Sequence, residues 1–224
     1  MNIKGIKGRR VLVVGGAGFV GSNLVRTLLA EEVNRVDVVD NLLSAEVENL
    51  PDDPRVVFIN GSITDDSILR SIQDDVTWVF HLATYHGNQS SIANPLADHE
   101  NNALTTLKLL EALKVRGGIE KIVYSSAGCA VAEKTFEGAS GSTDEDAPLS
   151  LWHDSPYSIS KILGEFYGNY YQQSFGLPFV KARFQNVYGP GEVLGAGQWR
   201  GPPSTVWRNV TPTFIYRALK QMPL

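Results

Sequence analysis

The sequence predicts a doubly wound α/β fold, in which a parallel sheet carries helices on both faces. Short apolar runs alternate with helical patterns, as in repeated β-α-β units. Several of these runs are almost continuously apolar, which is typical of strands buried on both faces of a parallel sheet. The first run leads directly into a glycine-rich turn and an amphipathic helix. With 224 residues, the chain is long enough for one large domain, or for a domain and part of a second.

Each expected element can be read from its own pattern. Apolar and β-branched residues predict strands at 10–14, 35–40, 55–59, 77–83, 121–126 and 178–184. Helical periodicity predicts helices at 22–31, 65–73, 96–115, 155–175 and 211–220. Asp65 is expected to cap the second of these helices. Two stretches rich in polar residues, glycine or proline, 128–154 and 189–209, read as long loops, which in a compact domain are usually functional or mobile.

Composition narrows the classes of function. The net charge is −4 and no basic run is present, which argues against nucleic acid as the main partner. The single cysteine, Cys129, cannot form an intrachain disulfide, so a reducing, cytoplasmic location is expected. Basic residues precede an uncharged run at 11–25 that mimics a signal peptide, but glycines interrupt that run, so targeting is rejected. No stretch is long enough to span a bilayer, and no metal site is expected.

The turn after the first strand matches a dinucleotide-binding pattern. Gly16, Gly18 and Gly21 fit G-x-G-x-x-G, and Gly15, Gly18 and Gly21 fit G-x-x-G-x-x-G. Such glycines allow a tight turn, a close approach of backbone to pyrophosphate, and close packing of helix on strand. The following helix N-terminus offers free N–H groups to the phosphates. Asp40 ends the next strand, where its carboxylate can bind the adenosine ribose and disfavour the extra phosphate of NADP. The expected cofactor is therefore NAD.

A second candidate site lies at the start of the helix expected at 155–175. Ser155 suits the N-cap and Pro156 the first turn. Tyr157 and Lys161 are four residues apart, so they lie on the same face of that helix. An isolated pair of this kind is more often structural, with the lysine stem packed along the ring. The rest of the chain has to decide between the two interpretations.

Ordered motifs along nearly the whole chain settle that choice. The segments "GGAGFVGSNL", "VVDNL", "GSITD", "HLAT", "NNALT", "VYSSAG", "PYSISK" and "RFQNVYGPG" follow one another. Together they resemble the extended short-chain dehydrogenase/reductases, in particular the NAD-dependent nucleotide-sugar epimerases and dehydratases of the UDP-glucose/galactose 4-epimerase type. This resemblance implies a Rossmann-type domain whose Tyr157 transfers a proton while Lys161 binds the nicotinamide ribose and favours the phenolate.

The resemblance also assigns roles to further residues. A serine at the end of the "VYSS" strand should position the reacting oxygen, with Ser126 as first choice and Ser125 as second, because the usual Tyr-Gly that fixes the register is missing. Asn186 and Arg208 are expected to bind substrate. Position 62, commonly aspartate in the family, is serine here, so the adenine contact falls to the Ile63 backbone. The cofactor site implied by the resemblance comprises Gly15, Gly18, Phe19, Val20, Gly21, Asp40, Asn41, Ser62, Ile63, Leu82, Ala83, Thr84, Asn101, Tyr157 and Lys161.

Several reactions fit such a site. Family dehydratases carry an Asp-Glu pair directly after the catalytic Ser/Thr, but Ala127 and Gly128 stand here, so dehydration is disfavoured. Epimerisation at C4 of a UDP-sugar is the expected reaction. Decarboxylation of a nucleotide sugar, an NAD(H)-dependent dehydrogenase or reductase, and a non-catalytic NAD-binding module remain alternatives. Cys129 lies near the position of an acid/base cysteine in a 3,5-epimerase variant, but a small buried hydrophobe is the favoured interpretation.

The resemblance also implies how the chain is organised and assembled. Residues 1–188 should form the NAD-binding domain, and 189–224 the beginning of a substrate-binding region that the family normally extends further. This chain is therefore expected to bind cofactor but to turn over substrate poorly, with only Asn186 and the loop to Asn209, including Trp199 and Arg200, left to hold the nucleotide. The helices near 96–115 and 155–175 are expected to pair two copies into a homodimer.

Overall fold

The computed structural model contains a parallel sheet with the strand order β3-β2-β1-β4-β5-β6. It describes residues 5–85, 87–130, 144–149, 151–192 and 210–223. The strands are β1 (Arg10–Val14), β2 (Arg35–Asp40), β3 (Val56–Asn60), β4 (Val76–His81), β5 (Lys121–Ala127) and β6 (Phe179–Phe184). Every neighbouring pair is parallel. The order reverses between β1 and β4, which makes that place the topological switch point of a doubly wound sheet. The predicted fold class is confirmed.

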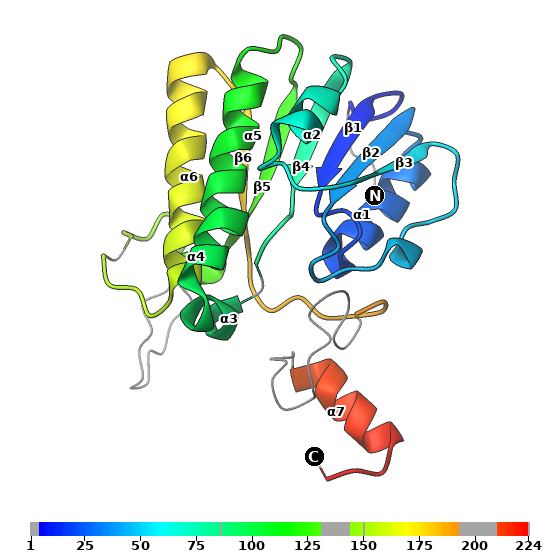
Figure 1. Cartoon of the computed structure of the whole chain (residues 1–224), viewed down its shortest axis with the longest axis vertical. Coiled ribbons are helices and arrows are strands. Elements are labelled where there is room, and N and C mark those ends of the chain that lie inside the picture. Colours follow the sequence, from blue (N-terminus) through cyan, green and yellow to red (C-terminus); the bar gives the residue numbers. More distant parts are fainter. Residues whose placement is uncertain (1–4, 86, 131–143, 150, 193–209, 224) are drawn as a thin grey trace.

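Helices cover both faces of this sheet. The α-helices are α1 (Phe19–Ala30), α2 (Asp66–Ser71), α3 (Gly87–Ala93), α4 (Pro95–Asp98), α5 (Thr105–Lys114), α6 (Pro156–Phe175) and α7 (Val210–Leu219). Short 3₁₀ turns occupy Val47–Asn49 and Gly128–Ala130. Helices α5 and α6 stand side by side on one side of the sheet, and α7 lies apart from it (Figure 1). No helix of the described part of the chain is long and apolar enough to cross a membrane.

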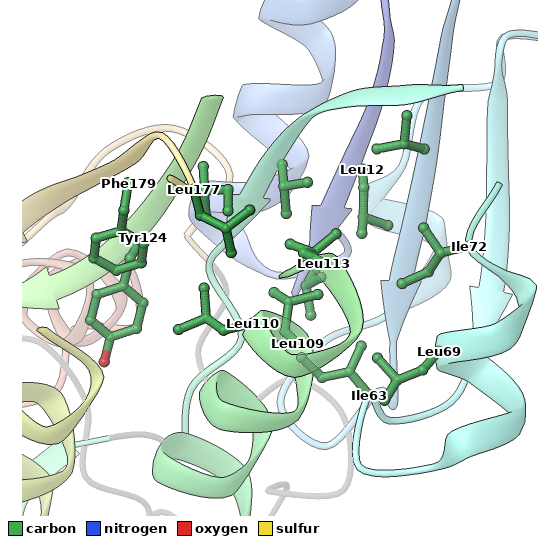
Figure 2. Close-up of a cluster of buried hydrophobic side chains, with 14 of the residues drawn as sticks. Leu12, Ile63, Leu69, Ile72, Leu109, Leu110, Leu113, Tyr124, Leu177 and Phe179 are labelled. Carbon is green, nitrogen blue, oxygen red and sulfur yellow. The ribbon is translucent and has the colours of Figure 1, made fainter. Parts of the chain in front are cut away.

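Alternation along the strands divides the core into two clusters. Leu12 and Val14 of β1 pack into the cluster that contains α2, α5 and α6 residues, while Val11 and Val13 pack into the one that contains α1 residues. Figure 2 shows the first cluster, where leucines of α5 lie between the β1 side and the aromatic pair Tyr124–Phe179. Successive side chains of a strand point to opposite faces, so β1 needs apolar residues at every position.

The structure corrects several boundaries. The predicted helix at 96–115 is interrupted: α4 is followed by a π-helical turn at His99–Leu104, and α5 starts only at Thr105. Helix α3 was not predicted, because its sequence GNQSSIA carries no apolar periodicity. Helix α1 begins at Phe19 rather than at residue 22, since Gly18 acts as its N-cap. The cap predicted at Asp65 is confirmed, because its side chain accepts from the Ser67 N–H.

Helix α6 approaches the sheet closely because two of its glycines face aromatic rings. A Cβ at Gly164 would stand 2.1 Å from the Tyr124 Oη, and one at Gly168 would stand 2.0 Å from the Phe179 Cε1. The two rings are stacked with centroids 5.8 Å apart. Any side chain at either glycine must therefore displace a buried ring. This close contact sets the position of the helix that carries Tyr157 and Lys161.

Replacing Gly168 by alanine should test that contact. Overpacking typically costs about 1–3 kcal/mol, and the better helix propensity of alanine returns roughly 0.5–1 kcal/mol. We therefore expect Gly168→Ala to lower the free energy of unfolding, measured by denaturant titration. Asn169→Ala on the exposed side of the same helix is the matched control and should leave stability unchanged or slightly raised. Equal stability of both variants would contradict the close packing of α6 on β6.

Candidate cofactor and catalytic site

A cavity of about 580 Å³ opens at the carboxyl ends of the strands, around the switch point between β1 and β4. Parallel doubly wound sheets bind their ligands at this place. Every residue predicted for the cofactor site except Lys161 lines the cavity: Gly15, Gly18, Phe19, Val20, Gly21, Asp40, Asn41, Ser62, Ile63, Leu82, Ala83, Thr84, Asn101 and Tyr157. Sequence motifs that are scattered along the chain from Gly15 to Tyr157 thus meet at one cavity.

Two glycines of the turn are required by the protein itself. Gly15 has a φ of +81°, and a Cβ there would stand 2.4 Å from the backbone N of Ala83. A Cβ at Gly21 would stand 2.2 Å from the carbonyl oxygen of Gly15. Both neighbours are backbone atoms that cannot give way. These glycines therefore let the turn approach β4 and let α1 pack against the turn.

Gly18 is different, because nothing in the fold demands glycine there. Its φ is −69°, and the nearest atom to an added Cβ is the Gly15 carbonyl oxygen at 3.5 Å, an ordinary contact. Gly18 lines the cavity, and as the N-cap of α1 it has no side chain to occupy the helix N-terminus. The free N–H groups there can bind an anion, which a side chain at this position would crowd. The cradle therefore fits the pyrophosphate of a dinucleotide.

Asp40 braces the same turn. Its Oδ2 accepts from the Ala17 N–H at 3.0 Å, and its Oδ1 accepts from the Leu42 N–H at 2.9 Å. Burial raises the pKa of the carboxyl group, and these backbone N–H bonds oppose that rise. The expectation that Asp40 lies next to the glycine turn is confirmed. Because its oxygens are held by the backbone on both sides, the carboxylate has a fixed position in the wall of the cavity.

The start of α6 places Tyr157 in the cavity wall. Ser155 caps the helix by accepting from the Ser158 N–H, and Pro156 occupies its first turn, both as predicted. The backbone N–H of Tyr157, which has no partner within the helix, donates to the Ser91 Oγ at 3.1 Å. Ser91 belongs to α3 and is fully buried. Helix α3 thus fixes the first turn of α6. Burial raises the pKa of the Tyr157 phenol to about 12.

Lys161 lies behind Tyr157 rather than in the cavity wall. Its Nζ is 5.6 Å from the centre of the Tyr157 ring and donates to the Ser125 carbonyl oxygen at 2.9 Å. The residue is only 2% exposed, and burial lowers the pKa of the ammonium to about 8, while the Asp98 carboxylate acts to raise it. The pair on one helix face is therefore present, with the lysine buried behind the ring.

The two candidate serines have different surroundings. The Ser126 Oγ donates to the Glu165 Oε1 at 2.5 Å, and Glu165 forms a two-point ion pair with Arg183. The Ser125 Oγ is buried and has no hydrogen-bond partner among the described residues. Neither serine lines the cavity, whereas Ala127, Gly128 and Cys129 beyond them do. The hydroxyl of Ser126 thus joins β5 to α6 through Glu165, whereas that of Ser125 stays unengaged among the described residues.

Asn102, which the sequence analysis did not single out, is more deeply buried than its neighbour Asn101. Asn101 lines the cavity, and its Nδ2 donates to the Ala97 carbonyl oxygen in the preceding turn. Asn102 is buried, and its Oδ1 accepts from the Tyr85 N–H and the Thr84 hydroxyl in the loop after β4. Helical periodicity cannot separate two adjacent asparagines when a π-turn of unknown position intervenes. The sequence carries no signal that separates the two, because both belong to an unbroken polar run from Asp98 to Asn102.

On the substrate side, the described part of the chain includes only some of the predicted residues. Asn186 lines the cavity together with Gln185 and Val187. Trp199, Arg200 and Arg208 lie outside the described residues, so their placement remains a prediction. Cys129 also lines the cavity and is partly exposed, so its interpretation as a small buried hydrophobe is wrong.

A glycine cradle at the switch point and a Tyr–Lys pair on a capped helix at the same cavity define a dinucleotide-binding domain of the short-chain dehydrogenase type. The chain belongs to the NAD dependent epimerase/dehydratase family, whose model matches residues 11–224. Membership confirms the family that the motifs predicted, and the cofactor in its description is the one predicted, NAD.

Relatives of known name agree with this assignment. The chain is 62% identical to the Bordetella bronchiseptica enzyme WbmF in complex with NAD⁺, with a TM-score of 0.86, covering 98% of this chain and 62% of that one. It is 35% identical over 181 residues to a putative UDP-glucose 4-epimerase of Methanocaldococcus jannaschii, covering 80% of this chain and 56% of the relative. It is also 34% identical over 187 residues to a dTDP-glucose 4,6-dehydratase of Streptomyces antibioticus, covering 80% and 54%. The chain thus spans somewhat more than half the length of these relatives.

The distinction between the glycines leads to a paired prediction. Gly18→Ala should keep the melting temperature of the wild type, because its Cβ meets no close neighbour, but should weaken NAD binding at least tenfold by crowding the anion site. Gly21→Ala should instead lower the melting temperature, because its Cβ meets backbone atoms. Differential scanning fluorimetry and isothermal titration with NAD measure the two effects. A Gly18→Ala protein with unchanged affinity would exclude the cradle as the pyrophosphate site.

Burial of Lys161 yields a pH-dependent prediction. Its pKa is about 8 in the folded protein and about 10.5 when unfolded, so the unfolded chain binds more protons between these values. Burial of the charged ammonium therefore lowers the free energy of unfolding by its full amount below pH 8, and this penalty disappears as the pH rises toward 10.5. Lys161→Met should therefore raise the melting temperature at pH 7, and this gain should shrink above pH 8. Melting curves over that range, with exposed Lys181→Met as control, test it; a pH-independent gain would contradict the assignment.

Proposed function

We propose that this protein is an NAD-dependent nucleotide-sugar epimerase that acts at C4 of a UDP-sugar through transient oxidation to a keto-sugar. The observation that carries the proposal is the meeting of the glycine cradle and Tyr157, with Lys161 behind it, at one cavity. The relatives named as UDP-glucose 4-epimerases support this reaction. We assign residues 1–188 to the NAD-binding domain and 189–224 to the beginning of a substrate-binding region.

The residues of the chain divide the work of such a reaction. Bound NAD would supply the hydride acceptor for the sugar carbon and return the hydride to its other face. The N–H groups at the start of α1 would hold the pyrophosphate, and Asp40 the adenosine ribose. Tyr157 would take the proton of the sugar hydroxyl at its Oη and later return it. The positive charge of Lys161, next to the ring, favours the ionised phenol that can accept this proton.

The cavity wall after β5 disfavours elimination of water. Among the described residues, those that line the cavity there are Ala127, Gly128 and Cys129, and they include no carboxylate. Removal of water from a sugar needs an acid and a base at the carbons beside the keto group. The dehydratase relatives therefore share the oxidation step with this chain, while the wall seen here supports a reaction that needs only proton and hydride transfer.

We further propose that the partner is a second copy of the chain. Helix α6 exposes Ile159, Phe166, Tyr170 and Phe175, each more than two fifths accessible. Leu96 and Val115, at the two ends of the helical run α4–α5, are about four fifths accessible. Exposed apolar surface of this kind marks an interaction site. Two α6 helices with their neighbouring α5 helices can cover each other around a two-fold axis.

Removal of the Tyr157 hydroxyl tests the reaction. The 224-residue chain is incubated with UDP-glucose, and chromatography measures epimerised sugar while fluorescence follows reduced cofactor. Loss of a positioned acid/base group lowers rates about 10²–10⁴-fold, so Tyr157→Phe should lose at least that factor in both signals. Tyr170→Phe, which removes an exposed hydroxyl from the same helix, should retain the wild-type rate. Equal rates for Tyr157→Phe and the wild type, both clearly above the enzyme-free background, would refute the proposed role.

The exposed face of α6 tests the assembly. Sedimentation velocity of the wild-type chain at micromolar concentration should show a dimer, and Phe166→Glu should shift it to a monomer because a charge cannot be buried unpaired at the interface. The matched control is Ala30→Glu, which adds the same charge at an exposed position of α1, on the other face of the sheet, and should leave the dimer intact. A monomeric wild-type protein would exclude this assembly.

A further inference from the structure

The ends of β5 and β6 carry a close contact to which the proposed function assigns no role. Gly128 follows β5 and Gln185 follows β6, each directly after the last paired residues of the two strands, Ala127 and Phe184. A Cβ at Gly128 would stand 1.8 Å from the Gln185 Nε2, 2.3 Å from its Cδ and 2.7 Å from its Oε1. The Gln185 amide therefore lies in the space that a side chain at position 128 would fill.

This contact, rather than the backbone, explains the glycine at position 128. Gly128 is not among the described residues with a positive φ, so an alanine could adopt its conformation. The three atoms nearest to an added Cβ all belong to the end of the Gln185 side chain. The glycine thus keeps one place open for one amide group.

The amide faces the cavity near the helix that carries the catalytic tyrosine. Gly128, Gln185 and Tyr157 all line the cavity, and the turn Gly128–Ala130 packs against α6. Gln185 is exposed, and within the described part of the chain no residue forms a hydrogen bond with its amide. The amide therefore offers a free donor and a free acceptor to a ligand that lies next to Tyr157.

The two strand ends are tied to α6 just before this contact. The Glu165 carboxylate accepts from the Ser126 hydroxyl at 2.5 Å and from the Arg183 guanidinium at 2.8 and 2.7 Å. Ser126 and Arg183 are direct neighbours in the sheet register, and Glu165 is only 1% exposed. Gly128 and Gln185 each follow two residues later. The helix that carries the catalytic tyrosine thus also fixes the strand ends from which the amide projects, as a preorganised binding group requires.

An amide in this wall suits a pair of neighbouring hydroxyls. The other residues at the two strand ends that line the cavity have small or apolar side chains, except for Asn186: Ala127, Gly128, Cys129, Phe184 and Val187. A bound ligand removes water from the amide, and each of its two polar atoms then needs a partner. Two adjacent hydroxyls supply both partners, since one can donate to the amide oxygen while the other accepts from the NH₂ group.

We propose that Gln185 is a sugar-binding residue whose amide, placed by Gly128, hydrogen-bonds the C2 and C3 hydroxyls of the hexose while C4 lies at Tyr157. This inference deepens the proposed function, on which it rests for the nucleotide sugar and for the reacting carbon. C1 of the hexose carries the UDP group, the C4 hydroxyl gives its proton to Tyr157, and C5 carries the ring oxygen and the hydroxymethyl group. The C2–C3 pair is therefore the one pair of neighbouring ring hydroxyls left for a planar amide.

Binding measured without turnover tests this role. All proteins carry Tyr157→Phe and are saturated with NAD, so that the sugar stays unreacted during isothermal titration. Gln185→Ala should weaken UDP-glucose binding about tenfold, because two hydrogen bonds are lost, and should leave the affinity for UDP unchanged. UDP-2-deoxyglucose lacks one of the two hydroxyls, so the same change should weaken its binding only about threefold. Gln173→Ala, which removes an exposed amide from α6, is the matched control and should change none of these affinities.

A second variant moves the amide without removing it. The Cβ of Gly128→Ala would overlap the end of the Gln185 side chain, which can swing away. The melting temperature should therefore stay that of the parent protein, while the affinity for UDP-glucose falls about tenfold, as in Gln185→Ala. In the Gln185→Ala background, Gly128→Ala should have no further effect, because the glycine acts only through the amide.

The outcomes separate this inference from the proposed reaction, which is assayed with Tyr157 intact. An unchanged affinity of Gln185→Ala for UDP-glucose, or an equal loss for UDP and both sugars, would overturn the role of Gln185 and leave the epimerisation standing. The expected differences in binding without any epimerisation would support Gln185 as a sugar-binding residue and contradict the reaction alone. A parent protein that binds UDP-glucose not at all would overturn both.

Discussion

Much of this site depends on the burial of one charge, the Lys161 ammonium, between α6 and β5. An almost fully buried lysine is costly, and here one hydrogen bond to the Ser125 carbonyl oxygen and the nearby Asp98 carboxylate offset only part of that cost. Those contacts require α6 to lie close to the sheet, which Gly164 and Gly168 permit by admitting the rings of Tyr124 and Phe179. They also require a fixed first turn of α6, which the Ser155 cap and Ser91 provide.

The two halves of the cavity are held by different physical means. On the cofactor side, backbone approaches backbone: Gly15 lies against the start of the loop after β4, and Asp40 accepts N–H bonds from both neighbouring turns. On the catalytic side, buried side chains form polar chains, Asp98–Asn102–Thr84 and Ser126–Glu165–Arg183. Backbone contacts give the cofactor side its shape, whereas the buried side-chain networks are strengthened by the low dielectric around them and make the catalytic side rigid.

The relation of sequence to structure is clearest in three segments. The glycine turn and Asp40 could be placed from spacing alone, because a tight turn and a strand end are local features with local signals. Helix α3 could not, since its helical state depends on burying Ser90 and Ser91 against other elements. The π-turn at His99–Leu104 was also missed, and with it the different roles of Asn101 and Asn102, because the run from Asp98 to Asn102 is polar throughout and no apolar repeat marks where the helix widens.

By itself, the sequence determined the class of fold, the order of its units, the glycine cradle with Asp40, and the Tyr157–Lys161 pair on a capped helix. These follow from residue type and short spacing, which local backbone geometry translates directly into structure. Only the tertiary structure decided that Lys161 lies behind the ring, that the Ser126 hydroxyl bonds to Glu165, and that Asn102 reaches Thr84. Those facts depend on how separate elements pack, and contacts between residues far apart in the chain leave no mark on the local pattern.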